Sequence, residues 1–260
     1  MRTMILALLV LVIAPAHAQD MMRNIDLSSP DMVSAEMTRA DVEAALAAAA
    51  GHPADFTGKR LSGLDLSGLD LSGAVLRAAR LNKTKLVGAR LERAVLDQAW
   101  LLEADLRGAK LQGANLFATQ MQRAKLEGAD LSGARVVADM TGANLTGASL
   151  ANARMGADMK NQSMGLMRAV LTSAKLDGAN LRGADLARAG IEFASLKGAN
   201  LTDASLAGAD LGGADLTGAF VAYADFSDVD LTSTRLVGTM GLDAAKNLDK
   251  AQNLGRAIRN

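Results

Sequence analysis

The stretch Ala179-Asn180-Leu181-Arg182-Gly183-Ala184-Asp185-Leu186 decides how this chain folds, because it begins two successive copies of a five-residue unit. The unit reads Ala, a polar residue, Leu, a second polar residue and Gly. A period of five fits neither the 3.6-residue period of an α-helix nor the two-residue alternation of a flat strand. A short period sustained over much of a chain is typical of a solenoid, in which each coil stacks on its neighbours.

The apolar centre of the unit recurs over most of the chain. It falls at every fifth position from Phe56 to Val136 and again from Leu171 to Leu236. We expect the centre and the Ala two residues before it to point inward, since only a small residue leaves room for Leu on a narrow axis. Gly suits the corner where the chain turns. No Pro follows Pro53, as expected if backbone N–H groups bond from coil to coil.

This pattern resembles that of the pentapeptide-repeat family over residues 54–238. The resemblance implies an all-β architecture, a right-handed, four-sided (quadrilateral) β-helix solenoid in which four pentapeptides make one coil. About nine coils at a strand spacing of about 4.8 Å would give a rod of roughly 43 Å. The exposed ends of such a solenoid need caps.

Both ends of the repeat are flanked by segments that predict short helical caps. Residues 19–53 form an N-terminal segment with a capping helix, whose pattern ends at Gly51 and Pro53. Residues 239–260 lose the five-residue period and have Leu and Ala at helix-like spacing. We interpret this stretch as a C-terminal cap with helical character.

Residues 1–18 have the features of a cleavable signal peptide. Arg2 precedes an apolar run from Met4 to Ala14, and Ala16-His17-Ala18 fits an Ala-x-Ala cleavage site. We therefore expect cleavage after Ala18 and a periplasmic or secreted protein. The apolar run is too short to span a bilayer as a stable helix, so no transmembrane segment is expected after cleavage.

The five-residue register breaks in the middle of the chain. Two steps span four residues, Val136 to Met140 and Met155 to Met159, and the spacing to Leu171 is then too long by two residues. This predicts a bulge or protruding loop at about residues 156–170, with three methionines as candidate loop residues: Met159, Met164 and Met167. Met either fills an imperfectly packed core there or provides soft ligands for Cu(I) outside the cytoplasm.

If residues 20 apart stack, the outward positions form columns along the rod. One column reads Asp65, Lys85, Asp105 and Lys125. Alternating charge at strand spacing predicts a ladder of ion pairs from coil to coil, each contributing up to about 1 kcal/mol. These charges have a structural explanation that requires no ligand.

Other outward positions carry apolar side chains. One face has Val75, Val95, Phe117 and Val137, the adjoining face has Trp100 and Leu102, and Phe220 and Tyr223 lie near the C-terminal end. A contiguous patch with Trp and Phe often marks a protein interface. The alternative is local packing under a cap, loop or tail. For Phe220 and Tyr223, end-to-end contact in a homo-oligomer is a further alternative.

Composition argues against catalysis and nucleic-acid binding. The chain has no Cys, and His52 is its only His beyond the predicted signal peptide. Neither a nucleophile–His arrangement, a zinc site nor a phosphate-binding Gly motif is present. Loss of Arg2 leaves 27 of the 28 basic residues against 28 acidic ones, whereas generic nucleic-acid binding needs a basic excess. We expect a non-enzymatic protein without a cofactor.

The leading hypothesis is therefore an exported scaffold or interaction module that binds another protein. The resemblance also implies an alternative, because well-understood relatives mimic duplex DNA, bind DNA gyrase and confer quinolone resistance. The signal peptide and the near-zero net charge argue against that role here. Metal or small-ligand binding at the Met-rich break is the third hypothesis.

Overall fold

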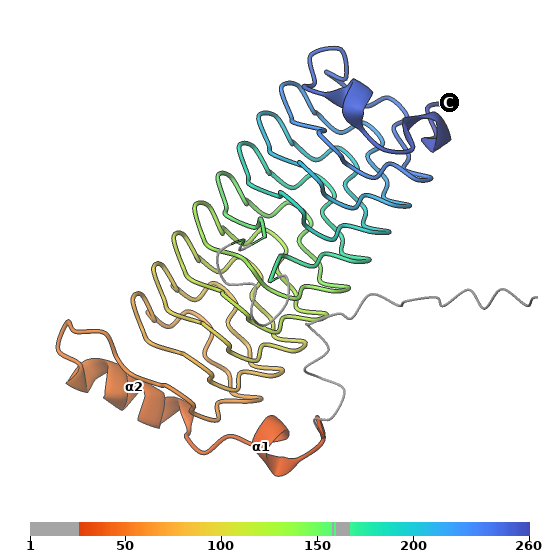
Figure 1. Cartoon of the computed structure of the whole chain (residues 1–260). Helices are drawn as coiled ribbons and strands as arrows, with labels where there is room; N and C mark the ends of the chain where they lie inside the picture. The colour runs from red at the N-terminus through yellow and green to blue at the C-terminus, as the bar shows by residue number, and fades with distance from the viewer. Residues whose placement is uncertain (1–25, 158, 160–166) are drawn as a thin grey trace, which may run out of the picture.

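The structure, a computed structural model, describes residues 26–157, 159 and 167–260 of the chain. The repeat winds into a rod of stacked coils, with short helical elements at both ends (Figure 1). Parallel bridges join residues 20 apart, such as Asp55 with Val75 and Val75 with Val95. The right-handed, four-sided β-helix predicted from the five-residue unit is confirmed. Each side contributes a single bridged residue rather than an extended strand.

The unit around Leu176 shows why the sequence must repeat every five residues. Leu176 N–H and Gly178 N–H donate to carbonyls of the next coil at 2.6 and 2.8 Å, while Lys175 N–H donates to the previous coil at 2.9 Å. Ala179 N–H then closes a turn onto Leu176 at 3.0 Å. Gly178 has a φ of 65°, the conformation that the third residue of a type II turn requires. Backbone polar groups are thus satisfied between coils.

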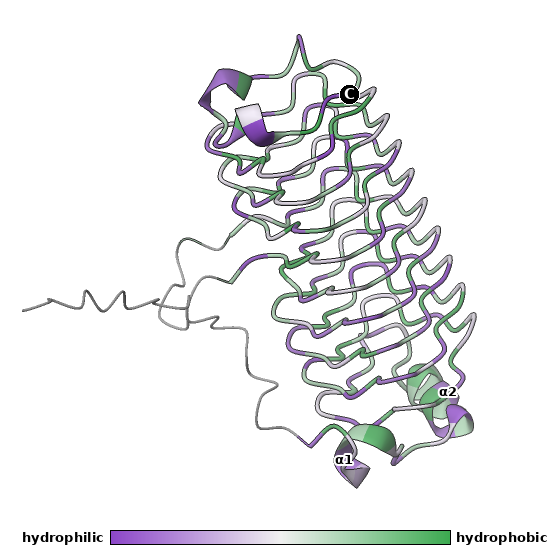
Figure 2. Ribbon diagram, turned by 90° about the vertical axis from the view of Figure 1, so that its right-hand side faces the viewer, coloured by the Kyte–Doolittle hydropathy of each residue, from purple (hydrophilic) through white to green (hydrophobic). Residues whose placement is uncertain are grey.

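The core is a column of Leu and Ala along the rod axis. Centres from Phe56 to Leu236 are buried, and so are the Ala residues two positions before most of them. In Figure 2 hydrophobic and hydrophilic residues alternate along the coils. Thr84 occupies an Ala position and is also buried. Its hydroxyl donates to Leu61 O at 2.8 Å, so a polar side chain fits there without an unpaired group.

Two helices lie at the N-terminal end of the rod: α1 (Pro30–Val33) and α2 (Arg39–Ala48). α2 begins with a capping box in which Thr38 and Asp41 bond each other's backbone N–H groups. Its Val42 is fully buried against the end of the core. Arg39 Nη1 donates to Asp65 O at 3.0 Å. α2 therefore covers the first coil, whose edge would otherwise be open to solvent.

The C-terminal segment continues the β-helix with sides of six residues instead of five. Bridged residues follow one another at this spacing: Met240, Lys246, Gln252 and Ile258. Its helical character is limited to two 3₁₀ turns, η3 (Leu248–Lys250) and η4 (Leu254–Arg256). The Leu and Ala residues that had helix-like spacing are half-buried against the last coil. They cover the core as the sides of a wider coil, not as one face of an α-helix.

The larger of the two register breaks is an insertion at one corner. Met155 is the centre of one side and Leu171 the centre of the next, because Asp139 bridges to Val170 and Arg154 to Asp185. Ala169 N–H closes the corner onto Met155 O at 3.1 Å.

The predicted step from Met155 to Met159 is therefore wrong, and Met159 is exposed outside the core. Met167 also lies in the insertion and is half-buried, whereas Met164 lies outside the described residues.

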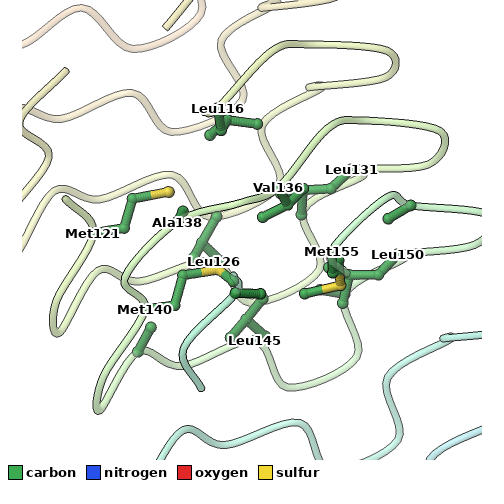
Figure 3. Close-up of a cluster of buried hydrophobic side chains, with 14 of the residues drawn as sticks. Leu116, Met121, Leu126, Leu131, Val136, Ala138, Met140, Leu145, Leu150 and Met155 are labelled. Carbon is green, nitrogen blue, oxygen red and sulfur yellow. The ribbon is translucent and has the colours of Figure 1, made fainter. Parts of the chain in front are cut away.

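The step from Val136 to Met140 is confirmed, since Gln120 bridges to Asp139, 19 residues away. Figure 3 shows Val136, Met140 and Met155 among the buried side chains around the break. The sulfur-bearing side chains of Met140 and Met155 are fully buried and fill core positions that Leu occupies elsewhere.

No helix in the described part of the chain has the length and apolar character needed to cross a membrane.

Candidate interaction surface

The apolar residues predicted on one face do stack there, but they are not an open patch. Val75 and Val95 are bridged and half-buried. The guanidinium of Arg135 lies over the Phe117 ring, 4.0 Å from its centroid, which is a cation–π contact. Val137 is only 3% exposed. This face offers a partner a narrow strip of Val rather than a broad aromatic surface.

Trp100 and Leu102 lie on the adjoining side, next to the N-terminal segment. Trp100 lines a cavity together with Met32 of α1, and Leu102 lines a neighbouring cavity that Met32 also reaches. Both side chains are half-buried. Trp100 and Leu102 therefore do not form one patch with Phe117. They lie on another side of the coil, and residues of the N-terminal segment lie against them.

An exposed apolar patch is found at the C-terminal end of the rod, formed by Phe220, Tyr223 and Met240. Their exposed fractions are 44%, 55% and 47%. Phe220 and Met240 are bridged, so their side chains are neighbours on one side of the β-helix. Tyr223 sits at the following corner with a φ of 62°, in a position that Gly holds in many other coils. We call these three residues the C-terminal patch.

Met240 is the member of this patch that the sequence analysis did not name. Its signal was the 20-residue spacing from Phe220, which places the two residues in one column. The five-residue register ends at Leu236, which places Met240 in the predicted cap, residues 239–260. The bridge between Phe220 and Met240 shows that this side of the β-helix has one more coil than the five-residue spacing of apolar centres predicts.

Carboxylates lie on both sides of the C-terminal patch along the rod. Asp203 N–H donates to Ala222 O at 3.0 Å, and Tyr223 N–H donates to Ala244 O at 3.3 Å, next to Asp243. Asp203 is in an ion pair with Arg182 at 3.6 Å. The C-terminal patch therefore lies between a coil that carries Asp203, paired with Arg182, and a coil that carries Asp243.

The outward Asp residues serve the backbone turns. Asp225 Oδ1 accepts hydrogen bonds from the backbone N–H of Ser227 at 3.0 Å and from its hydroxyl at 2.6 Å. Hydrogen bonds from Ser227 and then from Asn247 hold the pKa of Asp225 below its ordinary value. The same direction holds for every Asp whose pKa shift is resolved in the described residues. These groups stay ionised as acceptors, whereas a general acid needs a raised pKa.

The predicted ion-pair ladder forms at one of its steps. Lys85 Nζ lies 3.6 Å from Asp65 Oδ2, one coil away. Asp105 instead binds Arg107 of its own unit through two bonds of 2.7 and 2.8 Å. This local pair competes with the bond from coil to coil, because a bidentate Arg–carboxylate contact is the stronger geometry.

In the described residues no three His, Cys, Asp or Glu side chains gather as a metal site.

Comparison with known proteins shows the family of the chain. The family model for pentapeptide repeats (8 copies) matches residues 54–93, 89–128, 101–136, 138–160, 166–203 and 194–232. The chain belongs to the pentapeptide-repeat family. A search of curated proteins finds no match.

Two solved pentapeptide-repeat proteins are similar over most of the chain. HetL, involved in heterocyst differentiation regulation in the cyanobacterium Nostoc sp. strain PCC 7120, is 32% identical with a TM-score of 0.51, covering 86% of this chain and 95% of HetL. A trypsin-treated form of QnrB1, a plasmid-mediated fluoroquinolone resistance protein, is 19% identical with a TM-score of 0.50, covering 79% and 84%. The second likeness concerns the fold alone.

Proposed function

We propose that this pentapeptide-repeat protein is an exported, non-enzymatic interaction protein that holds a protein partner at the C-terminal patch. The observation that carries the proposal is the exposure of Phe220 and Met240 as bridged neighbours on a rigid rod. Clustered exposed apolar and aromatic side chains on a polar scaffold are typical of binding surfaces. Export is supported by the charge, apolar run and Ala-x-Ala site within residues 1–18.

The rigidity of the scaffold supports this role energetically. Phe220 and Met240 are fixed to the backbone of successive coils, so binding orders few backbone torsions and loses little conformational entropy. Burying apolar surface contributes about 25 cal/mol per Å². Asp243 would orient a partner with Lys or Arg beside its apolar residues, whereas Asp203 is already paired with Arg182.

Between residues 198 and 234 the sequence has six Asp residues and no Lys or Arg, but this acidic run does not favour the DNA-mimic alternative. Lys246 lies beside Asp225, and Arg256 beside Asp230, close enough to help lower the pKa of each carboxyl. The run of Asp residues is thus compensated in space by bases of the C-terminal segment. The chain as a whole has 28 basic and 28 acidic residues, so it lacks the uniform negative surface that mimicry of duplex DNA requires.

Crosslinking of the tagged protein in the cell envelope fraction tests the proposal. The test variant is Phe220→Ser with Met240→Ser, and the matched control is Val75→Ser with Val95→Ser, a bridged pair on another face. We expect wild type and control to be crosslinked to the same protein and the test variant to lose it. If the test variant retains that protein, the C-terminal patch is not the binding site.

Two further measurements complete the test. Sedimentation of the purified protein shows whether the partner is a second copy, because a Phe220→Ser variant would then change from dimer to monomer. N-terminal sequencing of the expressed protein tests export, and we expect the mature chain to begin at Gln19. An intact Met1 would contradict the proposed export.

A further inference from the structure

Residues 26–33, here called the strap, lie across one side of the first coils. Arg60, Arg80 and Trp100 follow one another in bridged positions on that side, and together with Asn82 and Leu102 they form what we call the strap groove. In Figures 1 and 2 α1, the helical part of the strap, lies at the N-terminal end of the rod, away from α2.

Three contacts hold the strap in the groove: two are polar and one is apolar. Asp31 Oδ1 accepts from Arg60 Nη1 at 2.7 Å. Met32 is only 4% exposed, and its carbonyl accepts from Asn82 Nδ2 at 3.0 Å. Asn82 Oδ1 in turn accepts from Leu102 N–H at 3.0 Å, which fixes the amide for this task. The groove thus recognises a carboxylate, an apolar side chain and a backbone carbonyl in sequence.

The strap does not fill the groove. A cavity of about 300 Å³ lies between them, lined by Asp26, Ser29, Asp31, Met32, Arg80 and Trp100. A second cavity of about 210 Å³ lies between Met32 and Leu102. Arg80 Nε is buried without a hydrogen-bond partner in the described part of the chain. A buried guanidinium N–H without an acceptor is unfavourable, so a segment with a better-placed acceptor would bind more tightly than the strap does.

The strap is also held less firmly than the helix that follows it. α1 has four residues, and its N-cap Ser29 makes no side-chain hydrogen bond. Val33 is 53% exposed. α2 has a complete capping box and buries Val42 in the core. Because α2 and Met37 pack on the end of the core and Ala35 is bridged to Leu61, the strap can leave the groove without opening the core, as expected of a segment of low local stability.

We propose that the strap groove is a binding site for a linear protein segment in which an acidic residue is followed directly by a long, unbranched apolar residue. The strap, with Asp31 and Met32, occupies this site in cis and is displaced when such a partner segment binds. Arg60 takes the carboxylate, Asn82 the carbonyl, and Arg80 the additional acceptor that the strap does not supply. This site lies at the opposite end of the rod from the C-terminal patch and does not depend on it.

Trp100 gives a direct readout, because it is the only Trp of the chain and lines the groove. The variant Asp31→Asn with Met32→Ser releases the strap, and we expect its Trp emission to shift to longer wavelength. A synthetic peptide of residues 26–34 added in trans should reverse the shift in a saturable manner. In a titration followed by the anisotropy of a fluorescein-labelled form of this peptide, wild type should bind at least about tenfold more weakly than the variant, because the tethered strap competes at high effective concentration.

Matched controls keep the proposal falsifiable. The same peptide with Asn and Ser at the positions of Asp31 and Met32 should not reverse the shift. The variant Asn82→Ala releases the strap from the groove side and should produce a similar shift, provided that both variants retain the circular dichroism of the wild type. If both variants fold and their emission equals that of wild type, or if both peptides bind equally, the proposal is overturned. If the emission of the wild-type protein shifts to longer wavelength on dilution, the groove takes the strap of a second copy, and the assignment to a separate partner is overturned.

Discussion

Asp230 Oδ1 accepts three hydrogen bonds, from Thr232 N–H at 2.9 Å, from the Thr232 hydroxyl at 2.7 Å and from Asn253 Nδ2 at 2.9 Å. Asp225 has the same arrangement with Ser227 and Asn247. One carboxylate therefore stabilises the turn of its own unit and holds the six-residue coil that follows. Two ionised side chains therefore add to the backbone bonds, such as Lys246 N–H to Ala224 O, that attach the C-terminal cap.

The first prediction is that the C-terminal cap is sensitive to acid. The pKa of Asp225 and the pKa of Asp230 are held below their ordinary value of 3.8 in the folded protein, first by the Ser227 and Thr232 hydroxyls. A lowered folded pKa gives stability that is fully present above the unfolded pKa and is lost as pH falls through the folded one. We expect amide protection of residues 241–258 to be constant above about pH 5 and to fall below about pH 4.

Paired Asp variants test the origin of this acid sensitivity. Asp225→Asn with Asp230→Asn should lower the protection of the cap at neutral pH and flatten its pH profile. Asp243→Asn is the matched control, because its carboxylate makes no hydrogen bond or ion pair with the described residues. A double variant that keeps the wild-type pH profile would show that other carboxylates hold the cap.

The second prediction concerns Asn247 and Asn253, which have φ values of 54° and 58°. Replacement of Asn247 by Gly removes the hydrogen bond from the side-chain amide to Asp225, but Gly adopts the left-handed backbone without strain. Replacement by Ala removes the same bond and adds a backbone strain of about 1–2 kcal/mol. We expect stability in urea to fall in the order wild type, Asn247→Gly, Asn247→Ala. Equal stability of the Gly and Ala variants would mean that the backbone conformation is not what Asn is needed for.

The third prediction concerns a corner of the regular repeat. Gly198 has a φ of 63°, and a Cβ there would meet no atom within 4 Å, so Gly198→Ala introduces backbone strain without a clash. We expect a loss of about 1–2 kcal/mol in the free energy of unfolding. Gly255→Ala is the control, since that residue also has open space and no positive φ. It should cost nothing measurable, and a similar loss at both sites would rule out backbone strain as the cause.

The fold was predictable because the constraint that produces it is local. A narrow axis admits one Leu and one Ala per side, so the five-residue unit appears directly in the sequence. The insertion at Met155 escaped this logic. Loop-closure entropy grows slowly with loop length, so a corner accepts extra residues at little cost, and spacing alone does not show where the register resumes. Met159 fits the pattern of an apolar centre in the sequence only because Met is apolar, whereas its side chain is exposed.

The C-terminal segment shows a second limit. Leu242 and Ala245, three residues apart, fit one face of an α-helix, but the same spacing also fits a side of six residues. The signal that separates the two readings is the recurrence of Leu-x-x-Ala-x-Asn, which ends at Asn247 and again at Asn253. No pattern in the sequence around Trp100 indicates that the strap lies over this side chain. It arises from docking of the strap, a contact between residues that are distant in the sequence.

The last prediction follows from the one-dimensional character of the solenoid, in which each coil contacts only its neighbours. Leu181 is fully buried in the middle of the rod, and Leu181→Ala should lower the free energy of unfolding by about 2–5 kcal/mol through lost burial and a cavity. Hydrogen exchange should show the loss of protection centred on the coils bridged to Asn180, which contain Ser149 and Asn200.

Leu236→Ala is the matched control at the end of the rod. Leu236 is 2% exposed and packs on the coil that precedes the cap, so the effect of its removal should stay near Ile258 and leave the coils around Leu181 protected. Protection lost uniformly over the rod in both variants would show that the coils unfold as one cooperative unit. Local loss in each variant would instead assign separate stabilities to the middle of the rod and to its C-terminal end, so that the coil beneath the cap opens independently of the coils around Leu181.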